Sequence, residues 1–264
     1  MLVASALNSK AEPPFCCITL SYVCVYVFGI AATARSFDGR IVGGYECTPH
    51  SQPWMVSLHY GYHFCGGVLI SEQWVLSAAH PYSMQLIVGD HNVRMFEGTE
   101  QLLKTDNIIW HPKQVYNYQT LDYDIMLIKL FHPVKVTDAV RPISLPTGCP
   151  FAGMPCTVSG WGSIYSDSSF MPFHLQCADV PVVSDEECEK SYPGMLTRRM
   201  LCAGHPEGGQ DACSSDSGSP LVCYGEVHGL VSWGRGCGLP GYPGVYTKVC
   251  EFLYWIRDVM AANP

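Results

Sequence analysis

Short β-rich stretches separated by turn residues recur along most of this chain, and they constrain its fold more than any other feature. Each is rich in β-branched or aromatic residues and is bounded by glycine, proline or serine, a pattern typical of an all-β sandwich or barrel. The seven clearest are WMVSLHY (54–60), CGGVLIS (65–71), QLIVGD (85–90), DIMLIKL (124–130), CTVSGWG (156–162), GLVSWG (229–234) and GVYTKV (244–249). Only EFLYWIRDVMAA at 251–262 has apolar residues at helical spacing, so we expect a single C-terminal helix.

Cysteine content places the protein in an oxidising compartment. The 264 residues include 14 cysteines, scattered without the short paired spacings of a zinc site, which indicates disulfides. Residues 13–34 carry no charge and end in Ala32-Thr33-Ala34, a small-residue cleavage site. We therefore expect a signal peptide at 1–34 and a secreted, extracellular protein. The apolar run is also long enough to cross a bilayer, so an uncleaved membrane anchor is the alternative.

The charge balance argues against one class of partner. The net charge is −8, and the basic residues form no cluster. Nucleic-acid-binding proteins carry a basic patch or stripe, so nucleic acid is not expected as a partner.

Three polar residues stand out against the β-rich background. His80 ends the segment LSAAH, Asp124 directly precedes an apolar run, and Ser217 lies in the turn-forming stretch DSGSP. Each alone has an ordinary structural explanation. Together with IVGG (41–44), SGWG (159–162) and SWG (232–234), they resemble the trypsin-like serine proteases of the chymotrypsin fold. The resemblance runs from Ile41 to Pro264, and in pattern it is similar to the anionic digestive trypsins of fish.

The resemblance implies a fold and a catalytic triad. The fold would be all-β, with two six-stranded antiparallel β-barrels, a cleft between them and a C-terminal helix. Ser217 would be the nucleophile, His80 its general base and later acid, and Asp124 the residue that orients the imidazole. The backbone N–H groups of Ser215 and Ser217 would form the oxyanion hole.

The same resemblance implies a specificity pocket. Asp211 would lie at its base, with Ser232, Gly234 and Gly244 along its walls and Tyr192 and Tyr246 supporting it. A buried carboxylate without a partner is costly, so the pocket should select a long cationic side chain. The implied reaction is peptide cleavage after Arg or Lys by a monomeric enzyme, with protein protease inhibitors as further partners.

Activation by cleavage is implied as well. RSFDGR at 35–40 would be an activation propeptide, cut after Arg40 by another protease, and 41–264 the protease domain. The freed amine of Ile41 would pair with Asp216, and this buried pair orders the pocket and the oxyanion hole in the family.

The loop GDHNVRMFEGTE (89–100) resembles the calcium-binding loop of the trypsins. Its hard oxygen ligands suit Ca²⁺. Asp90 stands where a longer Glu is usual in the family. The ligands implied are the side chains of Asp90, Glu97 and Glu100 and the backbone carbonyls of Asn92 and Met95.

The chain departs from the family pattern at four positions. Cys65 lacks its usual partner, because Pro81 occupies the position after His80, and Ser215 and Ser219 replace usual glycines. Pro81, the unpaired Cys65 and Ser215 support an alternative function, a catalytically impaired homologue that binds peptides or inhibitors in the same cleft. The disulfides implied by the family are Cys47–Cys177, Cys149–Cys250, Cys156–Cys223, Cys188–Cys202 and Cys213–Cys237.

Overall fold

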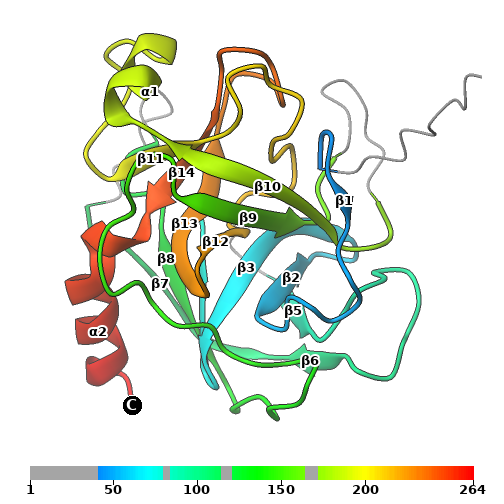
Figure 1. The fold of residues 1–264 in the computed structure, drawn as a ribbon. Helices are drawn as coiled ribbons and strands as arrows, with labels where there is room; N and C mark the ends of the chain where they lie inside the picture. The colour runs from blue at the N-terminus through cyan, green and yellow to red at the C-terminus, as the bar shows by residue number, and fades with distance from the viewer. Residues whose placement is uncertain (1–40, 80–83, 114–120, 164–171) are drawn as a thin grey trace, which may run out of the picture. The chain divides into compact units, whose positions relative to one another are not determined.

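A computed structural model of the chain describes residues 41–79, 84–113, 121–163 and 172–264. These residues form two antiparallel sheets, each of seven strands, and two α-helices (Figure 1). All seven stretches expected to be extended contain a strand. Among the described residues, no helix is long and apolar enough to cross a membrane.

The first sheet, here called the first barrel, comes from the N-terminal half of the described chain. Its order is β6-β5-β2-β3-β4-β8-β7. The edge strands β6 and β7 are separated in sequence only by Lys104, so one segment runs along both edges and curls the sheet towards a ring. With β6 and β7 counted as one strand, the sheet has six strands. The bounds are β2 (Met55–His59), β3 (His63–Ser71), β4 (Trp74–Ser77), β5 (Gln85–Val88), β6 (Gln101–Leu103), β7 (Thr105–Trp110) and β8 (Met126–Leu130).

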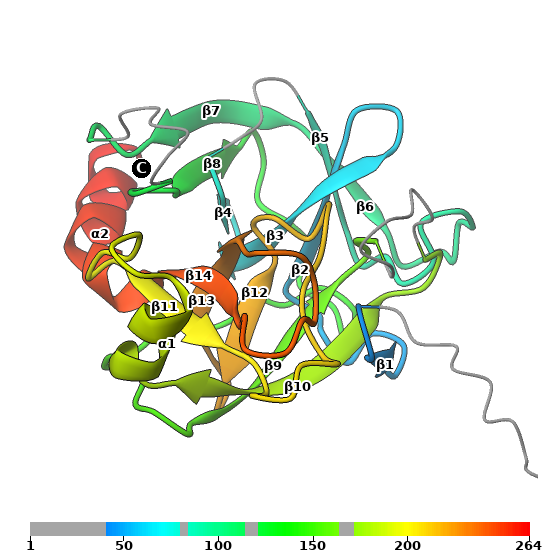
Figure 2. The same ribbon diagram turned by 90° about the horizontal axis from the view of Figure 1, so that it is seen from above.

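The second sheet, here called the second barrel, is closed. Six strands pair in the order β9-β10-β11-β14-β13-β12, β12 pairs with β9 again, and β1 adds to the outside of β10 (Figure 2). The all-β, two-barrel prediction is thus confirmed. The bounds are β1 (Tyr45–Glu46), β9 (Pro155–Gly160), β10 (Gln176–Val183), β11 (Met200–Ala203), β12 (Pro220–Cys223), β13 (Glu226–Trp233) and β14 (Gly244–Lys248).

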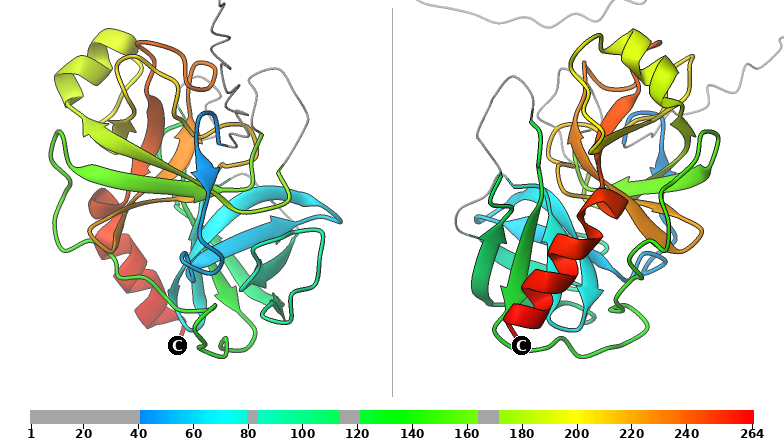
Figure 3. Two further views of the ribbon diagram at one scale, coloured as in Figure 1. Left: turned by 45° about the vertical axis from the view of Figure 1, so that its right-hand side comes forward. Right: turned by 90° about the vertical axis from the view of Figure 1, so that its left-hand side faces the viewer.

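The expected C-terminal helix is present. A 3₁₀ turn, η1 (Val249–Phe252), leads into α2 (Leu253–Ala262), which lies on the outside of the molecule (Figure 3). Phe252 and Ile256 are buried in a cluster that includes residues of both barrels, among them Leu76 and Leu230. The helix therefore holds the barrels together through its apolar stripe. The expectation of a single helix was wrong, because a second one, α1 (Asp185–Ser191), is present. It is capped by the Ser184 hydroxyl, which accepts from the backbone N–H of Glu187.

All five disulfides implied by the family are formed. Cys65 is a free, buried thiol. Burial raises the pKa of its thiol to about 12, with a further contribution from the charges of Asp124 and Asp216. It is therefore an inert apolar group rather than a nucleophile.

Candidate active site

Asp124 is held by groups from both barrels. Its Oδ1 accepts from the backbone N–H of Ala79 at 2.8 Å, and its Oδ2 accepts from the hydroxyl of Ser232 at 2.5 Å. The Thr247 hydroxyl donates to the backbone carbonyl of Asp124 at 2.8 Å. The carboxylate is buried, and these donors offset part of the cost of removing it from water. Thr247 was not anticipated, because it lies 123 residues further along the chain and no local pattern links the two.

His80, the predicted general base, lies outside the described residues, as do Pro81 and Arg40. Ala79, which immediately precedes His80, is buried against Asp124. The residue directly before His80 is thus hydrogen-bonded to Asp124, the carboxylate predicted to orient the His80 imidazole.

Ser217 lines a pocket of about 180 Å³ in the second barrel. This pocket brings the predicted nucleophile together with all four residues predicted to bind substrate. The residues concerned are Asp211, Ser232, Gly234 and Gly244, and Tyr246 also lines the wall.

Asp211 places a carboxyl group at the bottom of this pocket. Its Oδ2 accepts from the backbone N–H of Gly238 at 3.0 Å, whereas its Oδ1 is buried and has no hydrogen-bond partner among the described residues. Burial raises the pKa of this carboxyl to about 7, against the lowering effect of the neighbouring N–H groups of Gly238 and Ala212. A cation entering the pocket would supply the partner that the free oxygen lacks.

Two glycines keep the pocket open, for different reasons. A Cβ at Gly244 would lie 2.6 Å from Oδ1 of Asp211, so a side chain there would displace the carboxylate. A Cβ at Gly234 would make only ordinary contacts, so a side chain there would occupy the pocket without a clash. The Tyr192 hydroxyl donates to the carbonyl of Pro243 at 2.7 Å, directly before Gly244, and so supports the same wall.

The backbone around Ser215 has the conformation expected of an anion-binding turn. Ser215 has a φ of +73°, a left-handed conformation that favours glycine. Within the described residues, no acceptor takes up the backbone N–H of Ser215 or of Ser217. Both N–H groups are therefore free to bind an oxyanion.

His63, which sequence reasoning did not single out, fixes the other side of this turn. A carbonyl can only accept, so the contact of 3.2 Å between Nε2 of His63 and the carbonyl of Ser215 places the proton on Nε2. Nδ1 then accepts from the hydroxyl of Ser57 at 2.7 Å. Burial lowers the pKa of His63 to about 3, so the ring is neutral and serves as a fixed donor.

Ser219 follows the predicted nucleophile by two residues and is fully buried. Its hydroxyl has no hydrogen-bond partner among the described residues and points towards Gly66, where a Cβ would lie only 1.9 Å from it. The small-residue replacement is therefore accommodated because the facing position has no side chain.

The segment predicted to become the N-terminus lies against the pocket. Ile41 is fully buried, and the backbone N–H of Asp211 donates to the carbonyl of Val42 at 3.2 Å. Asp216 is fully buried, and its two oxygens accept from the N–H groups of Gly162 at 2.8 Å and Cys213 at 2.9 Å. Burial raises the pKa of the Asp216 carboxyl to about 7 against these two hydrogen bonds. Like Asp211, it would be stabilised in its charged form by a cation.

The predicted calcium loop contains a compact carboxylate cluster. One ligand oxygen from each of Asp90, Glu97 and Glu100 lies within 4.8 Å of the other two. Oδ1 of Asp90 is buried and finds no hydrogen-bond partner in the part of the chain that the structure describes. Burial, followed by the charges of Glu100 and Glu97, raises the pKa of Asp90 to about 7. Hard oxygen donors and a partner-free buried carboxylate fit a calcium ion.

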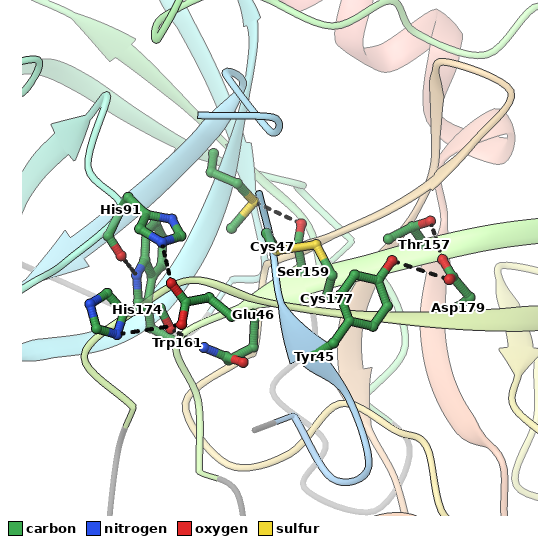
Figure 4. The surroundings of a disulfide bond; sticks show 12 residues. Tyr45, Glu46, Cys47, His91, Thr157, Ser159, Trp161, His174, Cys177 and Asp179 are labelled. Atoms are coloured by element: carbon green, nitrogen blue, oxygen red, sulfur yellow. Dashed lines mark hydrogen bonds and ion pairs between the residues drawn. A yellow bond between two sulfur atoms is a disulfide. The ribbon is translucent and has the colours of Figure 1, made fainter. Parts of the chain in front are cut away.

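This loop also docks on the second barrel. The backbone N–H of Val93 donates to the carbonyl of Phe173, and that of Leu175 donates to the carbonyl of His91, both at 2.9 Å. The Glu46 carboxylate lies 3.1 Å from Nε2 of His91 and 3.8 Å from Nδ1 of His174, close to the Cys47–Cys177 disulfide (Figure 4). Ordering the loop would therefore also order the contact between the barrels.

Known proteins match this chain over almost all of its described length. The family model described as Trypsin matches residues 41–256. "Trypsin" of Pleuronectes platessa is 59% identical over 242 residues, which cover 89% of this chain and 96% of the relative. "Serine protease 1" of Rattus norvegicus is 53% identical over 228 residues, covering 86% and 92%. "Anionic trypsin" of Canis lupus familiaris is 49% identical over 243 residues, covering 91% and 98%.

The family match, the two-barrel fold and a pocket lined by both Ser217 and a buried carboxylate all indicate the same family. The chain belongs to the trypsin family of serine endopeptidases.

Proposed function

We propose that this protein is a secreted digestive endopeptidase that cleaves after Arg and Lys and is made as a zymogen cut after Arg40. The observation that carries the specificity is the buried Oδ1 of Asp211, which has no hydrogen-bond partner in the pocket that Ser217 lines. A substrate guanidinium or ammonium supplies that partner, whereas an apolar side chain leaves the carboxylate unpaired.

In the proposed mechanism the cationic side chain enters the pocket and brings the following carbonyl to Ser217. The Ser217 hydroxyl attacks the carbonyl carbon while its proton passes to His80, and Asp124 stabilises the imidazolium. The oxyanion accepts from the N–H groups of Ser215 and Ser217, which His63 and the local backbone hold in place. His80 then protonates the leaving amine. Water attacks the acyl-enzyme with His80 again as base, and the acid product leaves.

Zymogen activation follows from two buried groups. Cleavage after Arg40 frees the amine of Ile41, whose reference pKa is about 8. Pairing with this amine would compensate the buried charge of Asp216. Before cleavage no charged amine exists at position 41, and ordering of the pocket and oxyanion hole would lack that contribution.

A bound calcium ion would neutralise part of the Asp90, Glu97 and Glu100 cluster and stabilise the docked loop. Carbonyls of Asn92 and Met95 would complete the oxygen ligands. Calcium has a structural role here and takes no part in the reaction.

The second candidate is a non-catalytic homologue that captures peptides or inhibitors in the same pocket. It is favoured by the free thiol of Cys65 and by the positive φ of a non-glycine residue at 215. Both departures lie beside the predicted catalytic groups, so we expect them to lower the catalytic rate more than the affinity for ligands.

Peptide turnover separates the two candidates. Residues 35–264 are expressed under oxidising conditions, cut at Arg40 with a protease that is then removed, and assayed with matched Arg, Lys and Phe peptide amides. We expect turnover of the Arg and Lys amides that is absent in Ser217→Ala. Correctly cut, folded protein with no more turnover than Ser217→Ala would favour the binding homologue, and turnover of Phe amides alone would contradict the specificity.

A further inference from the structure

A partly buried ion pair joins the segment that carries Asp124 to the second barrel. Nε and a terminal nitrogen of Arg199 contact the two oxygens of Asp122, at 2.8 and 2.5 Å. The Thr197 hydroxyl donates to the same carboxylate at 2.9 Å. The side chains of Arg199 and Asp122 are only 18% and 19% exposed. A two-pronged, largely buried pair of this kind fixes orientation as well as distance.

Aromatic groups complete the contact. The Arg199 guanidinium lies 4.1 Å from the centre of the Tyr123 ring, and His111 stacks on that ring at 4.7 Å. His111 in turn contacts Phe252 and Trp255 near the C-terminal helix. Asp122 and Tyr123, which directly precede Asp124, are therefore held from two sides. On one side are the side chains just before β11, and on the other is the aromatic stack that ends on η1 and α2.

The backbone at this point needs such support. Leu121 and Tyr123, on either side of Asp122, have φ values of +44° and +58°. Non-glycine residues keep left-handed conformations only where their surroundings impose them. Held in this shape, the segment presents Asp124 to Ser232 and Ala79.

We propose that Asp122 and Arg199 form a positioning pair that holds the proposed orienting carboxylate, Asp124, in its productive place and thereby sets kcat. The proposal rests on the proposed role of Asp124. The contacts that hold this segment are noncovalent: the hydrogen bonds of Asp124 with Ala79 and Ser232, and the ion pair of Asp122 with Arg199.

Arg198 provides a matched control. It is the same residue type at the adjacent position, and it pairs with Glu251 at 3.4 Å, but its side chain is 78% exposed. Loss of one arginine charge is therefore common to Arg198→Gln and Arg199→Gln, whereas loss of the Asp122 contact is not.

The test uses the activated enzyme, with the concentration of active sites determined by titration. Steady-state kinetics on an Arg peptide amide compare the wild type with Arg198→Gln, Arg199→Gln, Arg199→Lys, Asp122→Asn and the Asp122→Asn/Arg199→Gln double variant. Hydrogen exchange of residues 121–125 is followed in parallel on the Ser217→Ala background. Arg199→Lys keeps the charge and loses the two-pronged geometry, so it remains informative if a neutral variant fails to fold.

We expect kcat to fall by about 10- to 100-fold in Asp122→Asn and in Arg199→Gln, with KM changed less than about twofold, since displacement of a catalytic group by about 1 Å costs up to about a hundredfold. The double variant should be no slower than the slower single variant, and exchange at 121–125 should rise in each. Values of kcat equal to that of Arg198→Gln, or single effects that multiply in the double variant, would overturn the pair. Absence of Ser217-dependent turnover in the wild type would instead overturn the proposed function. In that case hydrogen exchange alone would test the positioning pair. Exchange at residues 121–125 that is the same in the Asp122 and Arg199 variants as in Arg198→Gln would overturn it.

Discussion

The two barrels supply different halves of the active site and are held together by different means. The second barrel is closed by strand pairing, and it contains Asp211 and Ser217, which line one pocket. Three disulfides join cysteines within it: Cys156–Cys223, Cys188–Cys202 and Cys213–Cys237. In the described part of the first barrel, Cys65 is a free thiol and no disulfide joins two of its residues.

The proposed substrate pocket and the proposed orienting carboxylate are therefore held in different ways. The pocket lies in a barrel cross-linked by disulfides, whereas Asp124 is held by hydrogen bonds and, in our proposal, by the Asp122–Arg199 pair. Disturbance of the first barrel should therefore reduce turnover before it reduces affinity for small cationic ligands.

The largest effect expected on the second-barrel side is at Asp211. Since burial raises the pKa of its carboxyl to about 7, the empty pocket holds a proton below that pH, and a cation must displace it. Benzamidine affinity should therefore fall about tenfold for each pH unit below 7. Asp211→Asn should lose the pH dependence and about 3–5 kcal/mol of affinity. Calorimetric titration across pH 5 to 8 measures both, and a wild-type affinity independent of pH would contradict the proposed state of the pocket.

Restoring a disulfide at Cys65 would test whether the first barrel is weaker because it lacks a covalent cross-link. Position 81 lies outside the described residues, and the family pattern places a cysteine there opposite Cys65. Pro81→Cys should stabilise the fold by about 2–4 kcal/mol once the bond forms, which corresponds to a rise in Tm of about 4–16 °C. Cys65→Ala/Pro81→Cys is the control. A disulfide verified by mass spectrometry without a rise in Tm would show that the first barrel is not limited by the missing link.

Removal of calcium should also weaken the first barrel more than the second. A ligand at a hundred times its Kd stabilises by about 2.7 kcal/mol, so EDTA should lower Tm by several degrees. Glu97→Gln should reduce this sensitivity, while Glu186→Gln on α1 should not. Calorimetry with and without EDTA provides the measurement, and equal sensitivity of the two variants would argue against the Asp90, Glu97 and Glu100 site.

The smallest effect concerns Ser215 within the rigid second barrel. Its left-handed conformation costs a side-chain-bearing residue about 1–2 kcal/mol, so Ser215→Gly should raise stability by about 1 kcal/mol. Ser214→Gly, at the exposed neighbouring position, should not do so. Chemical denaturation of both variants tests this, and a loss of stability in Ser215→Gly would show that the backbone here is not strained.

Local composition predicted seven of the fourteen strands, and the family resemblance predicted the five disulfide pairs and singled out the four residues that line the pocket with Ser217, because each depends on residue type at a given position. β-branched and aromatic residues bounded by turn residues were enough for β2 and β9, and Gly244 was singled out by the family resemblance. The contacts of Thr247, His63 and Arg199 were not predictable in this way. Each joins residues far apart in the chain, and each exists only once the strand register brings them together.

The order in which the disulfides can form has a consequence for biosynthesis. Cys47 is 130 residues from its partner Cys177. At translation rates of about 5–20 residues per second, Cys47 therefore waits about 7–26 s for Cys177 to be made. Between residues 41 and 148 the only other thiol is Cys65. A transient Cys47–Cys65 bond is thus the first cross-link open to the chain after residue 41, and wherever it forms it must isomerise before Cys47 can pair with Cys177.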